Sequence, residues 1–466
     1  MSIKPCCISS FSRWDLLRSL VFFAWFAILV ACSNSISVNS DSSGLKDVCL
    51  AASDTVNESD VNGYNNYENE DVSENGEKSS SSLFEYPYAG IPRISIKTMN
   101  YQKIEDRETE ISAMLEIWTD SSLESIALPT TIRGRGNTSW TSMPKKSYKL
   151  ELKYDAPVIG MPKEKDWALI ANYADKSLMK NYLMYQLAWT LGMPYSPRCK
   201  FVELYLNGDY QGVYLLTETI KVGKNRVDIP KTNESYLMEF DVKVREGDQR
   251  IIPSQNRLYN MHFPKNASDS IKGVFAKYIN SFEAYLKGGN LENIKDWINV
   301  ETYITHYWIQ EFSKNPDANF GSSVYFSWET NGVIQMGPVW DFDLAFGGHP
   351  EDSLADYRNW RIRGYDWNLK LFKDSTFARS VQKYWIDNRS VFLNVLDSID
   401  LLKEKIQQAT ENNFSRWNVL SSTKSHWHNT AYSSYDEAVE NLKKWICKRI
   451  NWIDAQYGET SKMEAE

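Results

Sequence analysis

Apolar and polar residues alternate over several short segments in the first half of the chain, which predicts β-strands. Ile94 and Ile96, for example, lie on the same face of one such segment. Asn207-Gly208 separates two apolar runs and suits the tight turn of a β-hairpin. A helical pattern over 175–191 interrupts the strands. The predicted strands cover 91–97, 112–118, 145–152, 201–206, 212–218 and 236–241, and 166–174 is predicted to be a strand followed by a turn. This half is therefore expected to form a largely antiparallel sheet with one helix against it.

The second half changes to apolar residues three and four positions apart, which predicts amphipathic helices. The predicted helices cover 270–287, 291–314, 370–390, 395–413 and 434–457. The last of these carries a stripe made of Val439, Leu442, Ile446, Ile450 and Ile453. Later strands are expected only near 323–326 and 333–344. The expected fold class is α+β, with a β-rich part followed by a mainly helical part.

The first residues have the pattern of an export signal. Basic residues precede an apolar run from Leu20 to Val30, which is shorter than a membrane-spanning helix. Small residues before Cys32 resemble the processing box of bacterial lipoproteins, which implies a signal peptide over 1–31 and lipidation of Cys32. An ordinary signal peptide is the alternative. Residues 32–89 are mostly polar and acidic and predict a flexible tether. The protein is thus expected in the cell envelope, periplasmic or surface-exposed, and attached to a membrane without spanning it.

The composition of the 466 residues narrows the possible partners. A net charge of -8 disfavours nucleic-acid binding. The 17 Trp, 27 Tyr and 19 Phe suit aromatic packing and stacking surfaces for ligands. Cys199 and Cys447 could form a disulfide or remain two thiols. A monomer is expected.

An acidic stretch, Met336–Gly348, is the first candidate for chemistry. It is predicted to be a short strand that runs into a glycine turn. Asp341 and Asp343 would share one face of that strand, with apolar side chains on the other. Two carboxylates on one face can bind a hard cation, although two solvated surface aspartates would show the same pattern. A carboxylate-pair glycosidase is disfavoured, because its two carboxylates must lie on opposite sides of the scissile bond.

A glycine-bearing segment precedes a lysine on the next predicted strand. Gly134 and Gly136 lie in a predicted turn, and Lys149 follows on the strand over 145–152. Backbone N–H groups in such a turn can approach an anion, and a following lysine can reach a phosphate. An ordinary hairpin would also explain the glycines.

Several stretches resemble the spore-coat CotH kinase family, in the same order along the chain. They are Arg133–Trp140 with Pro144–Tyr148, Asn207–Tyr214, Asn315–Asn319, Trp340–Gly347 and Tyr365–Phe377. The resemblance covers roughly residues 90–457. It implies a two-lobed, atypical protein-kinase-like fold over 90–458, with a β-rich lobe at about 90–245, a mainly helical lobe at about 246–458, and a tail over 459–466.

The resemblance also implies an activity and a set of site residues. The activity would be Mg²⁺-dependent transfer of phosphate from ATP to Ser or Thr of protein acceptors. Asp317 would be the catalytic aspartate, with Lys149 pairing with the phosphates. The implied nucleotide-binding residues are Arg133, Gly134, Arg135, Gly136, Asn137, Lys149, Thr217 and Glu218. The implied metal ligands are Asp341, assisted by Asp343 and Asn319.

Two positions depart from the usual kinase pattern. Ser322 stands where an asparagine metal ligand is expected, and Gln186 stands where a helix glutamate usually pairs with the lysine. These departures leave a second reading open. In that reading, the protein is a catalytically weak or inactive surface lipoprotein that binds a glycan or a protein partner.

Overall fold

The computed structural model describes residues 84–119, 122–123, 127–243, 248–252, 258–423 and 430–457. All of them belong to one compact unit, Leu83–Glu466, while Met1–Ser82 is assigned to a separate unit. The predicted signal peptide over 1–31, Cys32 and the tail over 459–466 lie outside the described residues. So does most of the predicted tether.

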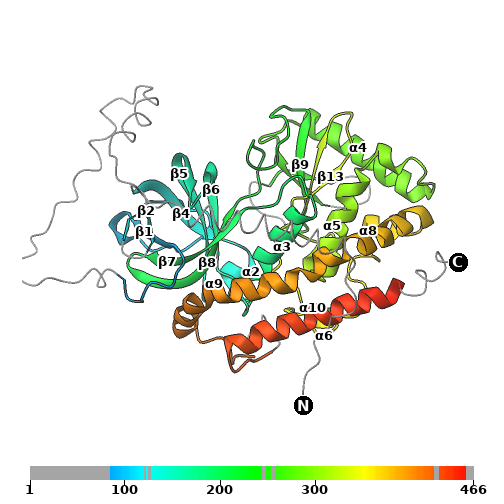
Figure 1. Ribbon diagram of the computed structural model, residues 1–466. Coiled ribbons are helices and arrows are strands. Elements are labelled where there is room, and N and C mark those ends of the chain that lie inside the picture. The colour runs from blue at the N-terminus through cyan, green and yellow to red at the C-terminus, as the bar shows by residue number, and fades with distance from the viewer. Residues whose placement is uncertain are drawn as a thin grey trace, which may run out of the picture. The chain divides into compact units, whose positions relative to one another are not determined.

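The β-rich part closes into a barrel (Figure 1). Its strands follow the order β1-β7-β8-β6-β5-β4-β2-β3, and an added antiparallel pairing between β1 and β2 closes the ring. β1 pairs in parallel with β7, whereas the other neighbouring strands of this sheet run antiparallel. The strands are β1 (Arg93–Thr98), β2 (Ile111–Thr119), β3 (Ser122–Leu123), β4 (Leu128–Arg135), β5 (Ser147–Val158), β6 (Met161–Ile170), β7 (Cys199–Leu206) and β8 (Asp209–Glu218).

Alternating side chains fill the barrel, as the sequence pattern predicts. Ile94, Ile132, Leu150 and Trp167 are fully buried in one apolar cluster inside it. The residues between them on the same strands point to the other face, where charged side chains gather. Most of the strands predicted for this region are therefore confirmed, although the expected sheet is a closed barrel. Two expectations are wrong: Gly134 lies inside β4 and not in a turn, and the strand predicted over 236–241 belongs to a second sheet.

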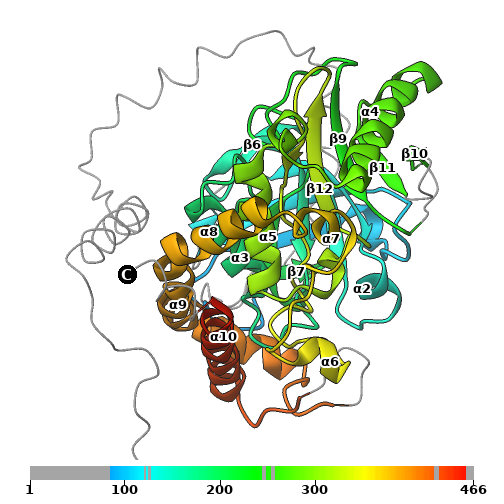
Figure 2. The same ribbon diagram turned by 90° about the vertical axis from the view of Figure 1, so that its right-hand side faces the viewer.

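A second sheet and most of the helices form the other part of the unit (Figures 1 and 2). Among the described residues this sheet has the order β10-β11-β9-β12-β13, with β9 (Ser235–Phe240), β10 (Arg250–Ile251), β11 (Tyr259–Phe263), β12 (Val324–Glu329) and β13 (Gln335–Met336). The helices are α2 (Thr138–Thr141), α3 (Lys180–Thr190), α4 (Asp269–Gly288), α5 (Val300–Phe312), α6 (Asp352–Ala355), α7 (Asp366–Leu371), α8 (Ser375–Leu393), α9 (Val395–Arg416) and α10 (Tyr435–Tyr457). Short 3₁₀ turns occupy η3 (Met99–Tyr101), η4 (Ile294–Asp296) and η5 (Pro316–Ala318).

Side-chain hydrogen bonds to the backbone mark where two of the predicted helices begin. α5 begins at Val300, later than the predicted 291, because the Asn299 side chain accepts a hydrogen bond from the Thr302 N–H and caps the helix there. α3 begins at Lys180 instead of 175, because the Asp175 carboxylate accepts the Lys180 N–H in the preceding turn. The mixed α+β class is confirmed.

Helix α9 connects the barrel to the helical part. The Asn413 side-chain oxygen accepts bonds from the Val213 N–H at 3.0 Å and from Lys145 Nζ at 2.9 Å. The neighbouring Asn412 donates to the buried carboxylate of Glu203 at 2.9 Å.

Within the described part of the chain, no helix is both long and apolar enough to cross a membrane. No disulfide joins Cys199 and Cys447.

Candidate functional site

The acidic stretch is not a strand beyond its first residue, so that part of the sequence prediction is wrong. β13 ends at Met336, and the backbone from Gly337 through Asp341 is irregular. Asp341 itself has a φ of 65°, a left-handed conformation that no strand contains. Phe342 is nonetheless fully buried, while Asp341 and Asp343 stay partly exposed. A local turn, and not strand alternation, presents the two carboxylates.

The first turn of α3 holds this stretch in place. The Asn181 side chain accepts the Phe342 N–H at 2.8 Å and donates to the Asp343 carboxylate. Lys180 Nζ donates to the Asp343 backbone carbonyl at 3.4 Å. One helix end thus fixes both the backbone and one carboxylate of the acidic stretch.

Asn315 joins the acidic stretch to Asp317. Its side-chain N–H donates to the Asp341 carbonyl at 3.0 Å, and its side-chain oxygen accepts the Asp317 N–H at 3.3 Å. Ser323, just before β12, donates to the Asp341 carboxylate at 3.3 Å. Asp317, Asp341 and Asp343 are therefore brought together from two separate segments.

The crowding of these carboxylates shows in their pKa values. Burial, and then the Asp317 carboxylate, raise the pKa of Asp341 to about 6. Burial and the Asp341 carboxylate raise the pKa of Asp343 to about 7. Burial also raises the pKa of Asp317, against the opposing charges of Lys243 and Arg361. Such a site gains stability when a cation neutralises it.

The donor set suits a magnesium ion that shares its shell with a substrate. Carboxylate oxygens are ligands that Mg²⁺ prefers, and protein sites commonly supply one or two of them, leaving the rest to water and phosphate. Among the described residues, no group of three or more His, Cys, Asp or Glu side chains is arranged to hold a metal by itself. Asn319 ends the turn that contains Asp317, but no described hydrogen bond connects it to the aspartates. Ser323, instead, contacts Asp341 directly.

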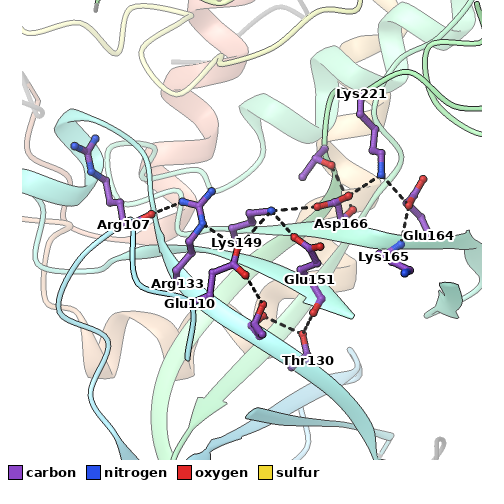
Figure 3. Close-up of polar contacts among 12 residues, drawn as sticks. Arg107, Glu110, Thr130, Arg133, Lys149, Glu151, Glu164, Lys165, Asp166 and Lys221 are labelled. Atoms are coloured by element: carbon purple, nitrogen blue, oxygen red, sulfur yellow. Dashed lines mark hydrogen bonds and ion pairs between the residues drawn. The ribbon is translucent and has the colours of Figure 1, made fainter. Parts of the chain in front are cut away.

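The structure places Lys149 in a network of carboxylates on the outer face of the barrel (Figure 3). Its ammonium lies 2.8 Å from Glu151, 3.2 Å from Asp166 and 3.9 Å from Glu110. Asp166 in turn pairs with Lys221 at 2.6 Å. These carboxylates of the barrel, and not the Gln186 helix position, are the partners of Lys149.

Arg135 is one of the cations that lie beside the acidic stretch, together with Lys180. Its guanidinium carbon is 4.8 Å from the centre of the Trp340 ring, and its charge lowers the pKa of Asp341. Trp340 stacks in turn on Tyr185 of α3, with ring centres 5.7 Å apart.

The glycine segment is packed against its own surroundings. A methyl group on Gly134 would lie 2.6 Å from the Trp140 ring, so only glycine fits beneath that ring. Gly136 has a φ of 100°, and Arg107 donates to its carbonyl at 2.9 Å and to the Asn137 side chain at 3.1 Å. The short helix α2 follows, where the sequence suggested only a turn.

The side chains of Thr217 and Glu218 form hydrogen bonds and ion pairs with other residues of the protein. Glu218 is fully buried and forms ion pairs with Arg226 at 2.5 Å and Arg198 at 3.2 Å. Thr217 is also buried, and its hydroxyl donates to the Arg198 carbonyl at 3.3 Å. Neither side chain is therefore placed to contact a ligand, and the Glu218 N–H is also used, in a bond to the Arg198 carbonyl at 3.0 Å.

Sequence reasoning missed Asn181, Lys180 and Ser323 as site residues. Asn181 is 162 residues away from Asp343 along the chain, so no local spacing marks it. Ser323 neighbours the predicted ligand position Ser322, which is itself buried at 7% exposure. Only the folded arrangement identifies these three.

The structure defines a mixed α+β protein with a cluster of aspartates and flanking cations, as phosphoryl-transfer sites have. The sequence model of the family described as CotH kinase protein matches residues 132–453, which include the whole aspartate cluster. The chain belongs to this family and is a kinase-like protein. A search of curated proteins found no match.

Proposed function

We propose that the protein is an exported atypical kinase that transfers the terminal phosphoryl group of ATP, with Mg²⁺, to Ser or Thr of a protein acceptor. The observation that carries this proposal is the mutual approach of Asp317 and Asp341, whose carboxylates each belong to a matched family segment. Phosphoryl transfer needs one carboxylate for the metal and one for the acceptor hydroxyl. The proposed two-lobed arrangement would place the nucleotide between the barrel and the helical part.

Each aspartate has a role that fits its surroundings. Asp341, assisted by Asp343 and Asn319, would hold Mg²⁺, which supplies charge neutralisation for the phosphates. Asp317 would orient the acceptor hydroxyl and accept its proton, a role that its raised pKa favours. The segment Arg133–Asn137 and Lys149 supply the candidate phosphate contacts.

The proposal includes the location of the protein. Lipidation at Cys32 would anchor the folded unit to a membrane of the cell envelope through the tether. The protein would act there as a monomer on protein substrates, without binding nucleic acid.

Transfer of labelled phosphate from ATP to a Ser-rich protein acceptor tests the activity. We expect incorporation by the wild type, and a loss of about 100-fold or more in Asp317→Asn and Asp341→Ala, because both act at the reacting groups. Asp387→Ala is a matched control, since Asp387 is half-exposed on α8 and pairs only with Lys383 in the described structure. Equal incorporation by all variants would reject the proposal. Thermal stabilisation by an oligosaccharide, without stabilisation by Mg²⁺-ATP, would favour the glycan-binding alternative.

A further inference from the structure

A small cavity lies where the start of α3 meets the glycine turn of the acidic stretch and the beginning of α10. Its volume is about 40 Å³, which has room for about three water molecules. A small ion fits such a space and a nucleotide does not. The residues that line it include none of the clustered aspartates, Asp317, Asp341 and Asp343. The cavity is therefore distinct from the proposed site of phosphoryl transfer.

Lys180 of α3 places a buried ammonium at this cavity. The residue is 7% exposed, and its Nζ is the atom that a methyl group on Gly348 would meet first. Within the described residues, this Nζ has one acceptor, the Asp343 carbonyl at 3.4 Å, and no ion pair. An ammonium has three N–H donors, and a buried donor without an acceptor is unfavourable. The remaining acceptors of this ammonium are therefore expected in the cavity.

The other charged side chains of the cavity lining are Asp175 and Lys176. Both oxygens of Asp175 already accept bonds, from the Ser177 N–H and hydroxyl and from the Lys180 backbone N–H. Lys176 donates to three main-chain carbonyls, and burial lowers its pKa to about 8 with no carboxylate opposing the shift. Two lysines thus face one carboxylate that is already bonded, and the N-terminus of α3 adds positive partial charge.

We propose that this cavity binds a small free oxyanion, phosphate or sulfate, which the Lys180 ammonium holds. Water supplies acceptors for the open donors of Lys180 but no charge, whereas an oxyanion supplies both. The Asn441 side chain, also in the lining, donates one N–H to the Tyr432 hydroxyl and has a second for the anion. This inference goes beyond the proposed function, and binding of the anion needs neither nucleotide nor metal.

The anion is linked to the acidic stretch through Lys180. The same ammonium donates to the Asp343 carbonyl, and the Asp343 charge acts on it from outside the cavity lining. The Asp343 carboxylate itself accepts a bond from Asn181. Asp343 and the anion therefore compete for the positive charge of Lys180, so that removing the Asp343 charge strengthens anion binding.

Calorimetric titration of the full-length protein with inorganic phosphate at pH 7.5, without nucleotide or divalent metal, tests the proposal. We expect the wild type to bind one phosphate per chain, in competition with sulfate but not with chloride at equal ionic strength. Lys180→Met should weaken this binding by about tenfold or more, since a charge-assisted hydrogen bond is lost. Lys383→Met is the matched control and should bind phosphate like the wild type, because Lys383 is exposed on α8 and pairs with Asp387.

Two further variants keep the test independent of how well Lys180→Met folds. Ala438→Leu fills the cavity from α10 without removing a charge, and should weaken phosphate binding by about tenfold or more. Asp343→Asn should strengthen it by about threefold or more. Amide hydrogen exchange over Phe346–Gly348 should become slower when phosphate is added to the wild type, because these residues line the cavity. The melting temperature without phosphate verifies the fold of each variant.

Three results would overturn the inference. One is an absence of phosphate binding by the wild type at about 10 mM phosphate, which would leave water as the occupant. Another is equal affinity in the wild type, Lys180→Met and Ala438→Leu. The third is a loss of binding in Arg135→Met with none in Lys180→Met, which would place the phosphate at the nucleotide site. None of these results decides whether the protein is a kinase, which the transfer of labelled phosphate tests separately.

Discussion

Replacing Asp343 with asparagine should make the metal-free protein more stable at neutral pH. With a pKa of about 7, the Asp343 carboxyl takes on its charge around neutral pH although burial and the Asp341 carboxylate both oppose that charge. Asparagine has nearly the same shape and keeps an oxygen that can accept the bond from Asn181. The substitution therefore removes an unfavourable charge while the local contacts remain.

The size of this stability gain follows from the pKa of Asp343. Raising it from an ordinary 3.8 to about 7 corresponds to about 4 kcal/mol, because each pH unit is worth about 1.4 kcal/mol. Below pH 4 the carboxyl is protonated in both the folded and the unfolded state, so the penalty is absent. As the pH rises to 7, the unfolded chain releases its proton first, and the folded state loses stability. Partial exposure of Asp343 screens the charge, so about half of this amount, roughly 2 kcal/mol, is expected.

Urea unfolding in excess chelator, at pH 5 and at pH 8, measures this difference. The stability of Asp343→Asn relative to the wild type should increase from pH 5 to pH 8 by about 1 to 2 kcal/mol. Added Mg²⁺ should reduce the difference in the free energy of unfolding between Asp343→Asn and the wild type at pH 8. The reason is that only the wild type has the repulsion between the Asp341 and Asp343 carboxylates that a bound cation removes. A variant that is less stable than the wild type at pH 8, or a difference independent of pH, would refute the electrostatic reasoning.

Three further substitutions test the packing around the site. Glu311→Gln removes the partner of Arg449, which lies 2.7 Å away with both side chains fully buried, and should lower the free energy of unfolding by about 3–5 kcal/mol in urea titrations. Gly134→Ala should lower the melting temperature, because the added methyl group meets the Trp140 ring at 2.6 Å and overpacking costs about 1–3 kcal/mol. Lys176→Met removes an ammonium that donates to three backbone carbonyls between α9 and α10, so amide hydrogen exchange there should become faster. Unchanged stability or exchange in any of the three would contradict its assigned contact.

Local patterns were sufficient to predict most strands and helices. The alternation around Ile94 and the Asn207-Gly208 turn reflect side-chain direction and backbone φ, which act over a few residues. Both turn residues indeed have positive φ, at 54° and 86°. The closure of the barrel was not predictable in this way, because β1 must pair with β7 as well as with β2, and its partners on β7 lie about 110 positions away along the chain.

The site was predicted in part, for a similar reason. Family motifs marked Asp317 and Asp341, which the structure brings together. Alternation suggested a strand through Asp341, but that residue adopts a left-handed turn whose geometry depends on Asn181 and Asn315. Residue type alone also could not show that Lys149 is surrounded by carboxylates, since these come from three different parts of the barrel.

The closing strand of the barrel has a mechanical consequence. β1 is the first strand of the described residues, and it pairs with β2 along its whole length and with β7 over Arg93–Ile96. Arg93 at its start is tied to Glu203 at 3.3 Å and to the Tyr86 carbonyl at 2.8 Å. A pull on the chain from its N-terminal side would load these bonds in shear, so that they must break together and not one after another. The barrel would resist such a pull at its first strand, before the load reached the aspartate cluster.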